Sequence, residues 1–136
     1  MKTNQSWCKI LLVDDDPICH LISEKIIQRY SSHSLECFTN PREALEKLRN
    51  WSANAPEKIP DFILLDLNMP EMDGWRFLDE FEKLPAEVSA KTEVFILSSS
   101  FLQADRDRAR AYGVVKNFLS KPLTEDMVKM FSGSCN

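Results

Sequence analysis

Three aspartates and one lysine follow apolar runs that are typical of buried strands. They are Asp14 and Asp15 after residues 10–13, Asp66 after residues 62–65 and Lys121 after residues 114–120. Because the carboxyl ends of parallel strands meet at the sheet edge where ligands bind, we expect these groups to lie together. Clustered carboxylates repel one another unless a cation joins them, and Mg²⁺ is a usual partner. A carboxylate in such a site can attack phosphorus and form an aspartyl phosphate.

Asp66 opens a turn-rich loop that ends at Gly74, and a carboxylate at such a strand end can be a metal ligand, a nucleophile or a helix cap. The ammonium group of Lys121 would add a point charge beside the phosphoryl oxygens. Ser98, at the end of the fourth apolar run, supplies a hydroxyl that can donate to the same oxygens. Each feature alone has an ordinary structural explanation, such as a helix cap or a turn. Their ordered combination is what favours a phosphoryl site.

Five short apolar runs alternate with helix-like segments along the chain. The runs are Lys9–Val13, Ser34–Phe38, Phe62–Leu65, 93–97 and 115–119. Four are continuous, as in strands covered on both faces, whereas Ser34–Phe38 alternates and fits a strand nearer an edge. Crossovers of this length require parallel strands. The sequence therefore predicts an α/β fold, (βα)₅, with a doubly wound five-stranded parallel sheet.

Helix signals occupy the segments between the runs. Asp16 and Pro17 read as an N-cap and a first helical residue, and the next helix carries an apolar stripe that we expect to face the core: Ile18, Leu21, Ile22 and Ile26. Asn40 and Glu43 have the spacing of a capping box. Further helices are expected over residues 75–84, 104–112 and 125–131, and residues 52–61 are expected to form a surface connection.

Composition sets the broad class. The 136 residues are 43% hydrophobic and 28% charged, which predicts one globular domain over residues 1–136 with a core at about 8–131 and short tails. A net charge of −4 argues against nucleic-acid binding, and no apolar stretch is long enough to predict a membrane span. Cys8, Cys19 and Cys37 are expected to be free thiols, which suits a cytoplasmic location.

Four segments together resemble the receiver domain of response regulators of the CheY type: residues 10–17, 61–74, 94–100 and 118–123. The resemblance covers nearly the whole chain, and the order and separation of the motifs match. It implies a flavodoxin-like fold with strand order 2-1-3-4-5, an order that is taken from the family rather than worked out from the residues.

The resemblance also implies a role for each site residue. Asp66 matches the phospho-acceptor and is also a Mg²⁺ ligand. Asp15 matches the direct Mg²⁺ ligand, Asp14 assists it, and Asn68 matches the residue whose backbone carbonyl binds the ion. Ser98 matches the switch hydroxyl, Phe118 matches the aromatic switch, and Lys121 matches the family's lysine, which is joined to Pro122 by a cis bond.

The implied function is two-component phosphorelay signalling. The phosphoryl group would come from a histidine kinase or a histidine phosphotransfer protein. A downstream protein would read the face made by the fourth helix, fifth strand and fifth helix, and a weak homodimer is compatible with this reading. We expect a stand-alone receiver, or one excised from a larger kinase, that is not an enzyme beyond its own phosphorylation and dephosphorylation.

Two other functions remain open. The first is a Mg²⁺-dependent phosphatase with an aspartyl nucleophile, against which stands Asn68, where such enzymes often place a second acid. The second is an interaction module that never takes phosphate, against which stands the complete set of acidic, hydroxyl and lysine residues.

Overall fold

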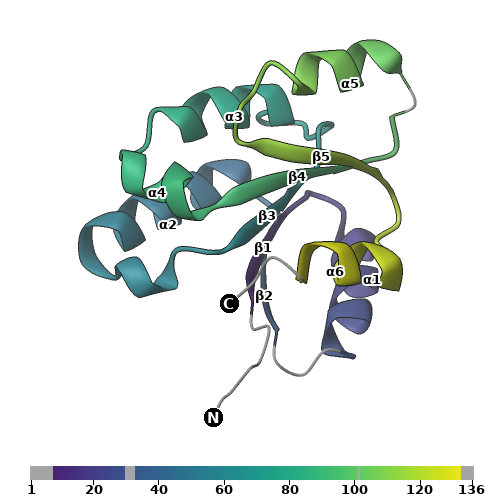
Figure 1. Cartoon of the computed structure of the whole chain (residues 1–136), viewed down its shortest axis with the longest axis horizontal. Helices are drawn as coiled ribbons and strands as arrows, with labels where there is room; N and C mark the ends of the chain where they lie inside the picture. The colour runs from purple at the N-terminus through teal and green to yellow at the C-terminus, as the bar shows by residue number, and fades with distance from the viewer. Residues whose placement is uncertain (1–7, 30–32, 101, 133–136) are drawn as a thin grey trace.

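Five parallel strands form one sheet in the computed structural model, which describes residues 8–29, 33–100 and 102–132 (Figure 1). The strands are β1 (Lys9–Val13), β2 (Ser34–Phe38), β3 (Phe62–Leu65), β4 (Glu93–Ser98) and β5 (Val115–Ser120). Their order across the sheet is β2-β1-β3-β4-β5, and every neighbouring pair is parallel. The predicted fold class and strand order are confirmed.

Helices cover both faces of this sheet. They are α1 (Pro17–Gln28), α2 (Pro41–Asn54), α3 (Gly74–Glu82), α4 (Ala86–Lys91), α5 (Gln103–Ala109) and α6 (Glu125–Ser132), with a short 3₁₀ turn, η1, at Pro56–Lys58. Figure 1 shows α2, α3 and α4 on one side of the strands and α1 and α6 on the other.

Successive residues of the central strands supply two separate cores, as the alternation of side chains along a strand requires. Leu11 and Ile63 pack in the core under α2 and α3, which also holds Phe77 and Leu78. The neighbouring Leu12 packs in the other core, whose remaining members include Cys19 of α1 and Val128 of α6. Strands buried on both faces explain why the central runs are continuously apolar.

Helix α1 begins as predicted but turns a different face to the sheet. Its N-cap is Asp16, whose carboxylate accepts the Ile18 N–H, and Pro17 follows at the first position. The predicted inward stripe is wrong for three of its four residues, because Ile18, Leu21 and Ile22 are 61%, 52% and 38% exposed, whereas Ile26 packs against the core. The buried residues of α1 are Cys19, Ser23 and Ile27. An apolar patch is therefore left on the surface of α1.

Other element boundaries also differ from the prediction. Helix α2 continues to Asn54 and η1 follows, so most of the expected loop at 52–61 is helical. The short helix α4 was not predicted, and α5 ends at Ala109 rather than at residue 112. Strand β5 is an edge strand with Lys116 and Asn117 exposed, so the expectation that it is covered on both faces is wrong.

The three cysteines among the described residues divide into two groups. Cys19 and Cys37 are free, as expected, whereas Cys8 is disulfide-bonded, so the expectation of a free thiol there is wrong. The bond between Lys121 and Pro122 is cis, as the family resemblance implies. Within the described ranges, no helix has the length and apolar character needed to cross a bilayer. The predicted tails at residues 1–7 and 132–136 lie largely outside the described residues, and the single-domain assignment stays a prediction.

Candidate functional site

Backbone hydrogen bonds beyond the strand ends hold the acidic residues at one edge of the sheet. Asp14 directly follows β1, and its N–H donates to the Phe38 carbonyl oxygen at 3.1 Å. Asp66 directly follows β3, and its N–H donates to the Val13 carbonyl oxygen at 3.0 Å. Since β1 and β3 are neighbours, the ladder between them fixes the spacing of the two aspartates.

The side chains of the predicted acidic residues meet at this edge. One carboxylate oxygen from each of Asp14, Asp15 and Asp66 lies within 4.8 Å of the others. Lys121, which directly follows β5, brings its Nζ to 2.7 Å from Asp14 Oδ2 and 3.4 Å from Asp66 Oδ1. The structure therefore brings together four of the predicted site residues, from three strands.

Burial makes it energetically costly for the carboxylates of this cluster to carry their charges. Asp14 is fully buried, and Asp66 is 4% exposed. Burial and the neighbouring Asp14 charge raise the pKa of Asp66 to about 6, although Lys121 and the backbone N–H of Asn68 act in the opposite direction. Burial lowers the pKa of Lys121, but its contacts with Asp14 and Asp66 more than offset this, so that pKa lies above its ordinary value.

The donor set fits a hard divalent cation. Three carboxylates converge on one small region that holds a single ammonium group from Lys121, so negative charge remains in excess. Mg²⁺ binds through one or two carboxylates, keeps waters as further ligands and neutralises this kind of excess. Asp14, Asp15 and Asp66 are the residues that would hold such an ion, and Asn68 lines the same cavity.

Above Asp66 the site is open to solvent. A cavity of 480 Å³ is lined by Asp15, Asp16, Pro17, Asp66, Asn68, Ser99 and Lys121. A phosphoryl group carried by another protein can therefore approach the Asp66 carboxylate without passing through the core.

Ser98 lies in the wall of the site rather than on the cavity surface. Its side chain is fully buried, and its Oγ accepts the Ser100 N–H at 3.1 Å. The Ser98 carbonyl oxygen accepts the Lys121 N–H at 2.9 Å, which ties β4 to the lysine. Ser99 is the serine that lines the cavity, and the sequence alone gave no reason to choose it over Ser98.

Phe118, the predicted aromatic switch, lies away from the carboxylates between β5 and α5. Its ring is half-buried, and the Arg106 guanidinium carbon lies 4.8 Å from the ring centroid. The same ring lines a cavity of 180 Å³ between α5 and β5. The side chain thus has both a polar partner at its surface and free space beside it.

Sequence reasoning missed the residues that hold Asp14. The Asp16 N–H donates to Asp14 Oδ1 at 2.9 Å, and His20 Nε2 lies 2.5 Å from the Asp14 carbonyl oxygen. The Cys19 thiol also contacts the Asp14 carboxylate, and burial together with this contact raises the pKa of Cys19 to about 12. All three come from the first turn of α1 or its cap, a proximity that follows only from the fold.

Gly74 is required by a close approach of the loop that follows Asp66. Its N–H donates to the Leu67 carbonyl oxygen at 2.9 Å, so the loop folds back on itself. A Cβ atom at residue 74 would lie 2.7 Å from the Asp66 carbonyl oxygen and 2.9 Å from the Leu67 Cα. The backbone beside the candidate nucleophile therefore has no room for a larger residue.

Comparison with protein-family models matches residues 10–131 to the response regulator receiver domain. The chain is 32% identical over 121 residues to the sensor histidine kinase CheAY of Helicobacter pylori, covering 89% of this chain and 14% of that protein. It is 27% identical to the chemotaxis protein CheY of Bacillus subtilis, covering 88% of this chain and 90% of that protein. A protein-glutamate methylesterase/protein-glutamine glutaminase of Archaeoglobus fulgidus is 33% identical, and the chain spans 30% of its length.

Solved structures give the same result. A two-component response regulator from Cytophaga hutchinsonii superposes with a TM-score of 0.84 at 30% identity, covering 93% of this chain and 94% of that one. A response regulator receiver protein from Dyadobacter fermentans gives 0.78 at 29% identity, covering 90% and 93%.

Proposed function

The chain belongs to the response regulator receiver domain family of two-component signalling, and from this membership we propose that Asp66 is its phospho-acceptor. One observation carries the proposal: the Asp66 carboxylate lies at the base of an open cavity, 3.4 Å from the Lys121 ammonium group and beside two further carboxylates. Receivers of the CheY type act as switches, and we propose that this chain likewise turns over no outside substrate.

The proposed step transfers one phosphoryl group from a phosphohistidine. An Asp66 carboxylate oxygen attacks phosphorus, the bond from phosphorus to the imidazole nitrogen breaks, and the electron pair returns to that nitrogen, which is then protonated. Lys121 neutralises charge on the transferred group, since its Nζ is already held between Asp14 and Asp66. Such transfer needs alignment and charge neutralisation more than covalent help from the protein.

We propose Mg²⁺ as the cofactor, held by Asp14, Asp15, Asp66 and the backbone carbonyl of Asn68. When bound, the ion would neutralise phosphoryl and carboxylate oxygens together. The chain's own contribution is to keep the carboxylates at a fixed spacing through the ladder between β1 and β3.

The phosphodonor would be a histidine kinase or a histidine phosphotransfer protein. Pro17, the first residue of α1, lines the acidic cavity, and the exposed Ile18, Leu21 and Ile22 follow on the same helix. A protein that carries its phosphohistidine into the cavity must cover the start of α1. The apolar patch there supports the assignment of α1 to the donor.

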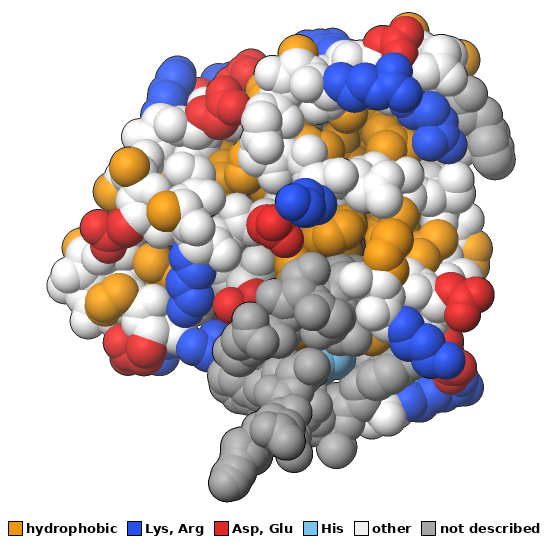
Figure 2. Space-filling model, in the orientation of Figure 1, with side chains coloured by type: hydrophobic (Ala, Val, Ile, Leu, Met, Phe, Trp, Pro, Cys, Tyr) orange, Lys and Arg blue, Asp and Glu red, His pale blue; other side chains and the backbone are white. Residues whose placement is uncertain are grey.

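The downstream partner would read the face of α5, β5 and α6. Figure 2 shows hydrophobic side chains gathered between α5 and α6, below a row of basic side chains on α5. We propose that Ser98 moves toward the phosphoryl group and that Phe118 then rotates inward into the space that the Ser98 side chain leaves. Such a change would bias this face between two packings. A cytoplasmic location and a weak homodimer remain part of the same proposal.

The direct test is phosphorylation by a small donor. The purified protein is incubated with acetyl phosphate and Mg²⁺ and weighed intact. We expect one added phosphoryl group in the wild type, and none with Asp66→Asn or with a chelator present.

Asp16→Asn is the matched control, because Asp16 lines the same cavity and asparagine caps a helix as well as aspartate does. This variant should gain the phosphoryl group like the wild type. An unchanged mass gain in Asp66→Asn would show that the acceptor is a different residue.

A further inference from the structure

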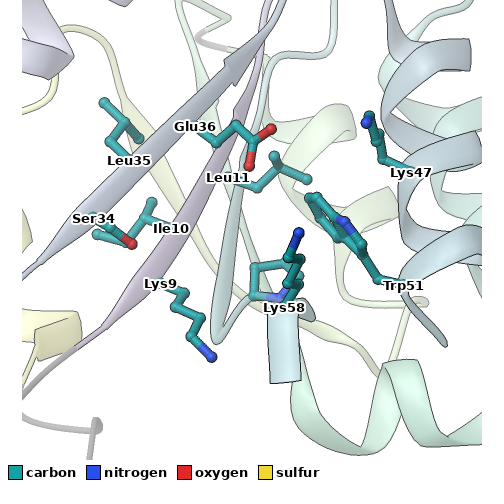
Figure 3. A pocket seen from close by; sticks show the side chains of 10 residues that line it. Lys9, Ile10, Leu11, Ser34, Leu35, Glu36, Lys47, Trp51 and Lys58 are labelled. Atoms are coloured by element: carbon teal, nitrogen blue, oxygen red, sulfur yellow. The ribbon is translucent and has the colours of Figure 1, made fainter. Parts of the chain in front are cut away.

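The opposite edge of the sheet holds a second cavity, of 530 Å³, at the amino ends of the strands. It lies between β1, β2 and helix α2, and Figure 3 shows its lining side chains. Lys9 and Ser34 are the first residues of β1 and β2, whereas Asp14 and Asp66 follow the last residues of β1 and β3. The length of β1, about 16 Å, therefore separates this cavity from the acidic site.

The cavity is basic in an otherwise acidic chain. Three lysines line it, Lys9, Lys47 and Lys58, against one acid, Glu36, while the chain as a whole carries a net charge of −4. Lys9 Nζ donates to the Glu57 carbonyl oxygen. Within the described residues, Lys47 and Lys58 make no ion pair or hydrogen bond through their ammonium groups. Two unpaired cations thus line the same cavity.

An apolar surface lies beside these cations. Three buried residues form its apolar floor: Leu11, which is 1% exposed, Pro60, and Trp51, which is 8% exposed and carries an indole ring. Lys47 and Trp51 lie on one side of α2, because they are separated by four residues. Within the described residues the indole N–H has no hydrogen-bond partner, so it remains available as a donor.

The lining therefore specifies three features of a ligand. The ammonium groups favour an anion, the indole ring of Trp51 at the cavity floor favours a flat apolar body, and Glu36 can accept one N–H or O–H donor. Lysine binds phosphate as a point charge, whereas planar carboxylates are typically recognised by arginine, which is missing from the described lining. These features together describe a ring-bearing organic phosphate.

We propose that the cavity between β2 and α2 binds a small organic phosphate of mononucleotide type, with its phosphate at Lys47 and Lys58, its ring against Trp51 and a ring donor at Glu36. The site is independent of the acidic pocket and of the proposed phosphorylation of Asp66.

Adenosine monophosphate serves as the probe, and the indole N–H signal of Trp51 in a ¹H–¹⁵N NMR spectrum serves as the readout, assigned with Trp51→Phe. We expect the signal to shift saturably with the nucleotide. Adenosine and inorganic phosphate should each bind about tenfold more weakly or worse, because each lacks half of the recognised chemistry.

The double variant Lys47→Gln/Lys58→Gln should lose about tenfold or more in affinity. Lys25→Gln/Lys83→Gln is the matched control, because both of these lysines are exposed, lie outside the cavity lining and change the net charge equally. It should bind like the wild type, and so should Asp66→Asn, which tests independence from the acidic pocket.

Three results would overturn the proposal. One is an indole signal that never shifts, and another is an equal loss of affinity in the two double lysine variants. The third is equal binding of inorganic phosphate and the nucleotide, which would indicate general attraction of anions rather than a site for a ring-bearing ligand.

Discussion

At the carboxyl end of β1, the Asp14 side chain is fully buried and pairs with Lys121 at 2.7 Å. At the amino end of the same strand, Lys47 and Lys58 surround a cavity but remain exposed. The two regions carry opposite charge and differ in how much solvent reaches that charge. Breaking a buried pair costs several kcal/mol because the remaining charge is uncompensated, whereas exposed charges contribute little to stability. Without a bound cation, the buried charges at the carboxyl edge therefore lower the free energy of unfolding, whereas the exposed charges at the amino edge do not.

The largest expected effect comes from removing the lysine of the buried region. Lys121→Met should lower the free energy of unfolding by about 3–5 kcal/mol at pH 8 without Mg²⁺, because Asp14 and Asp66 then lose their shared ammonium group. Urea denaturation measures the change. Lys58→Met is the matched control in the exposed region and should change stability by less than about 0.5 kcal/mol. If both variants lost the same free energy of unfolding, the two regions would not differ in the way described above.

The next effect is a gain in stability, and it comes from removing the charge of Asp66. The folded protein holds the pKa of Asp66 at about 6, against 3.8 for a free aspartate. Stability associated with the protonated form is thus fully present below pH 3.8 and is lost as the pH rises through about 6. Asp66→Asn avoids this loss, so it should stabilise the metal-free protein by about 2–3 kcal/mol at pH 8 and by almost nothing near pH 4.

Thermal or urea unfolding across this pH range tests the prediction. Addition of Mg²⁺ should raise the stability of the wild type, since a ligand that binds only the folded state stabilises it, but should have much less effect on Asp66→Asn. A stability gain that does not depend on pH would mean that the Asp66 charge is not its source.

A smaller effect should follow from crowding the loop beside Asp66. Gly74→Ala places a Cβ 2.7 Å from the Asp66 carbonyl oxygen, so the backbone must shift, at a cost of about 1–3 kcal/mol. Phosphorylation by acetyl phosphate should also slow, because the carboxylate moves with its backbone. Gly113→Ala is the control, since a Cβ there meets no atom within 4 Å. Denaturation and the rate of mass gain would show both effects, and identical behaviour of the two variants would count against the crowding.

The acidic edge was predictable because chain topology alone determines it. A carboxylate that directly follows a buried parallel strand must lie at the carboxyl edge, so Asp14, Asp66 and Lys121 are placed near one another without knowledge of any side-chain packing. The roles of Ser98 and Phe118 are different, because they depend on rotation between two packings and stay predictions.

The buried face of α1 was not predictable from hydrophobicity. Ser23 is 1% exposed, whereas the more apolar Ile18 and Leu21 lie in solvent. The positions of the apolar residues therefore predict the wrong buried side for α1. The face toward the sheet instead includes the polar Ser23 and Cys19, which contacts Asp14. The prediction assumed that the apolar side of a helix faces the core, and the exposed apolar residues of α1 do not obey that rule.

Helix α4 and the basic cavity were missed for a different reason. Helix α4 is six residues long and buries Val88 alone, so it carries no periodic pattern that a sequence can reveal. The cavity draws its lysines from β1, α2 and η1, which are far apart in the sequence. Only the packing of α2 against the β1–β2 edge brings them together.

The hydrogen bond from the Asp66 N–H to Val13 has a consequence for how a signal would travel. It anchors the acceptor to the central strands, which should show the slowest amide hydrogen exchange in the molecule. A phosphoryl group added to Asp66 would therefore displace these central strands very little. Displacement would be transmitted outward to the edge of the sheet, where β5 pairs only with β4, and to the short helix α5 beside it.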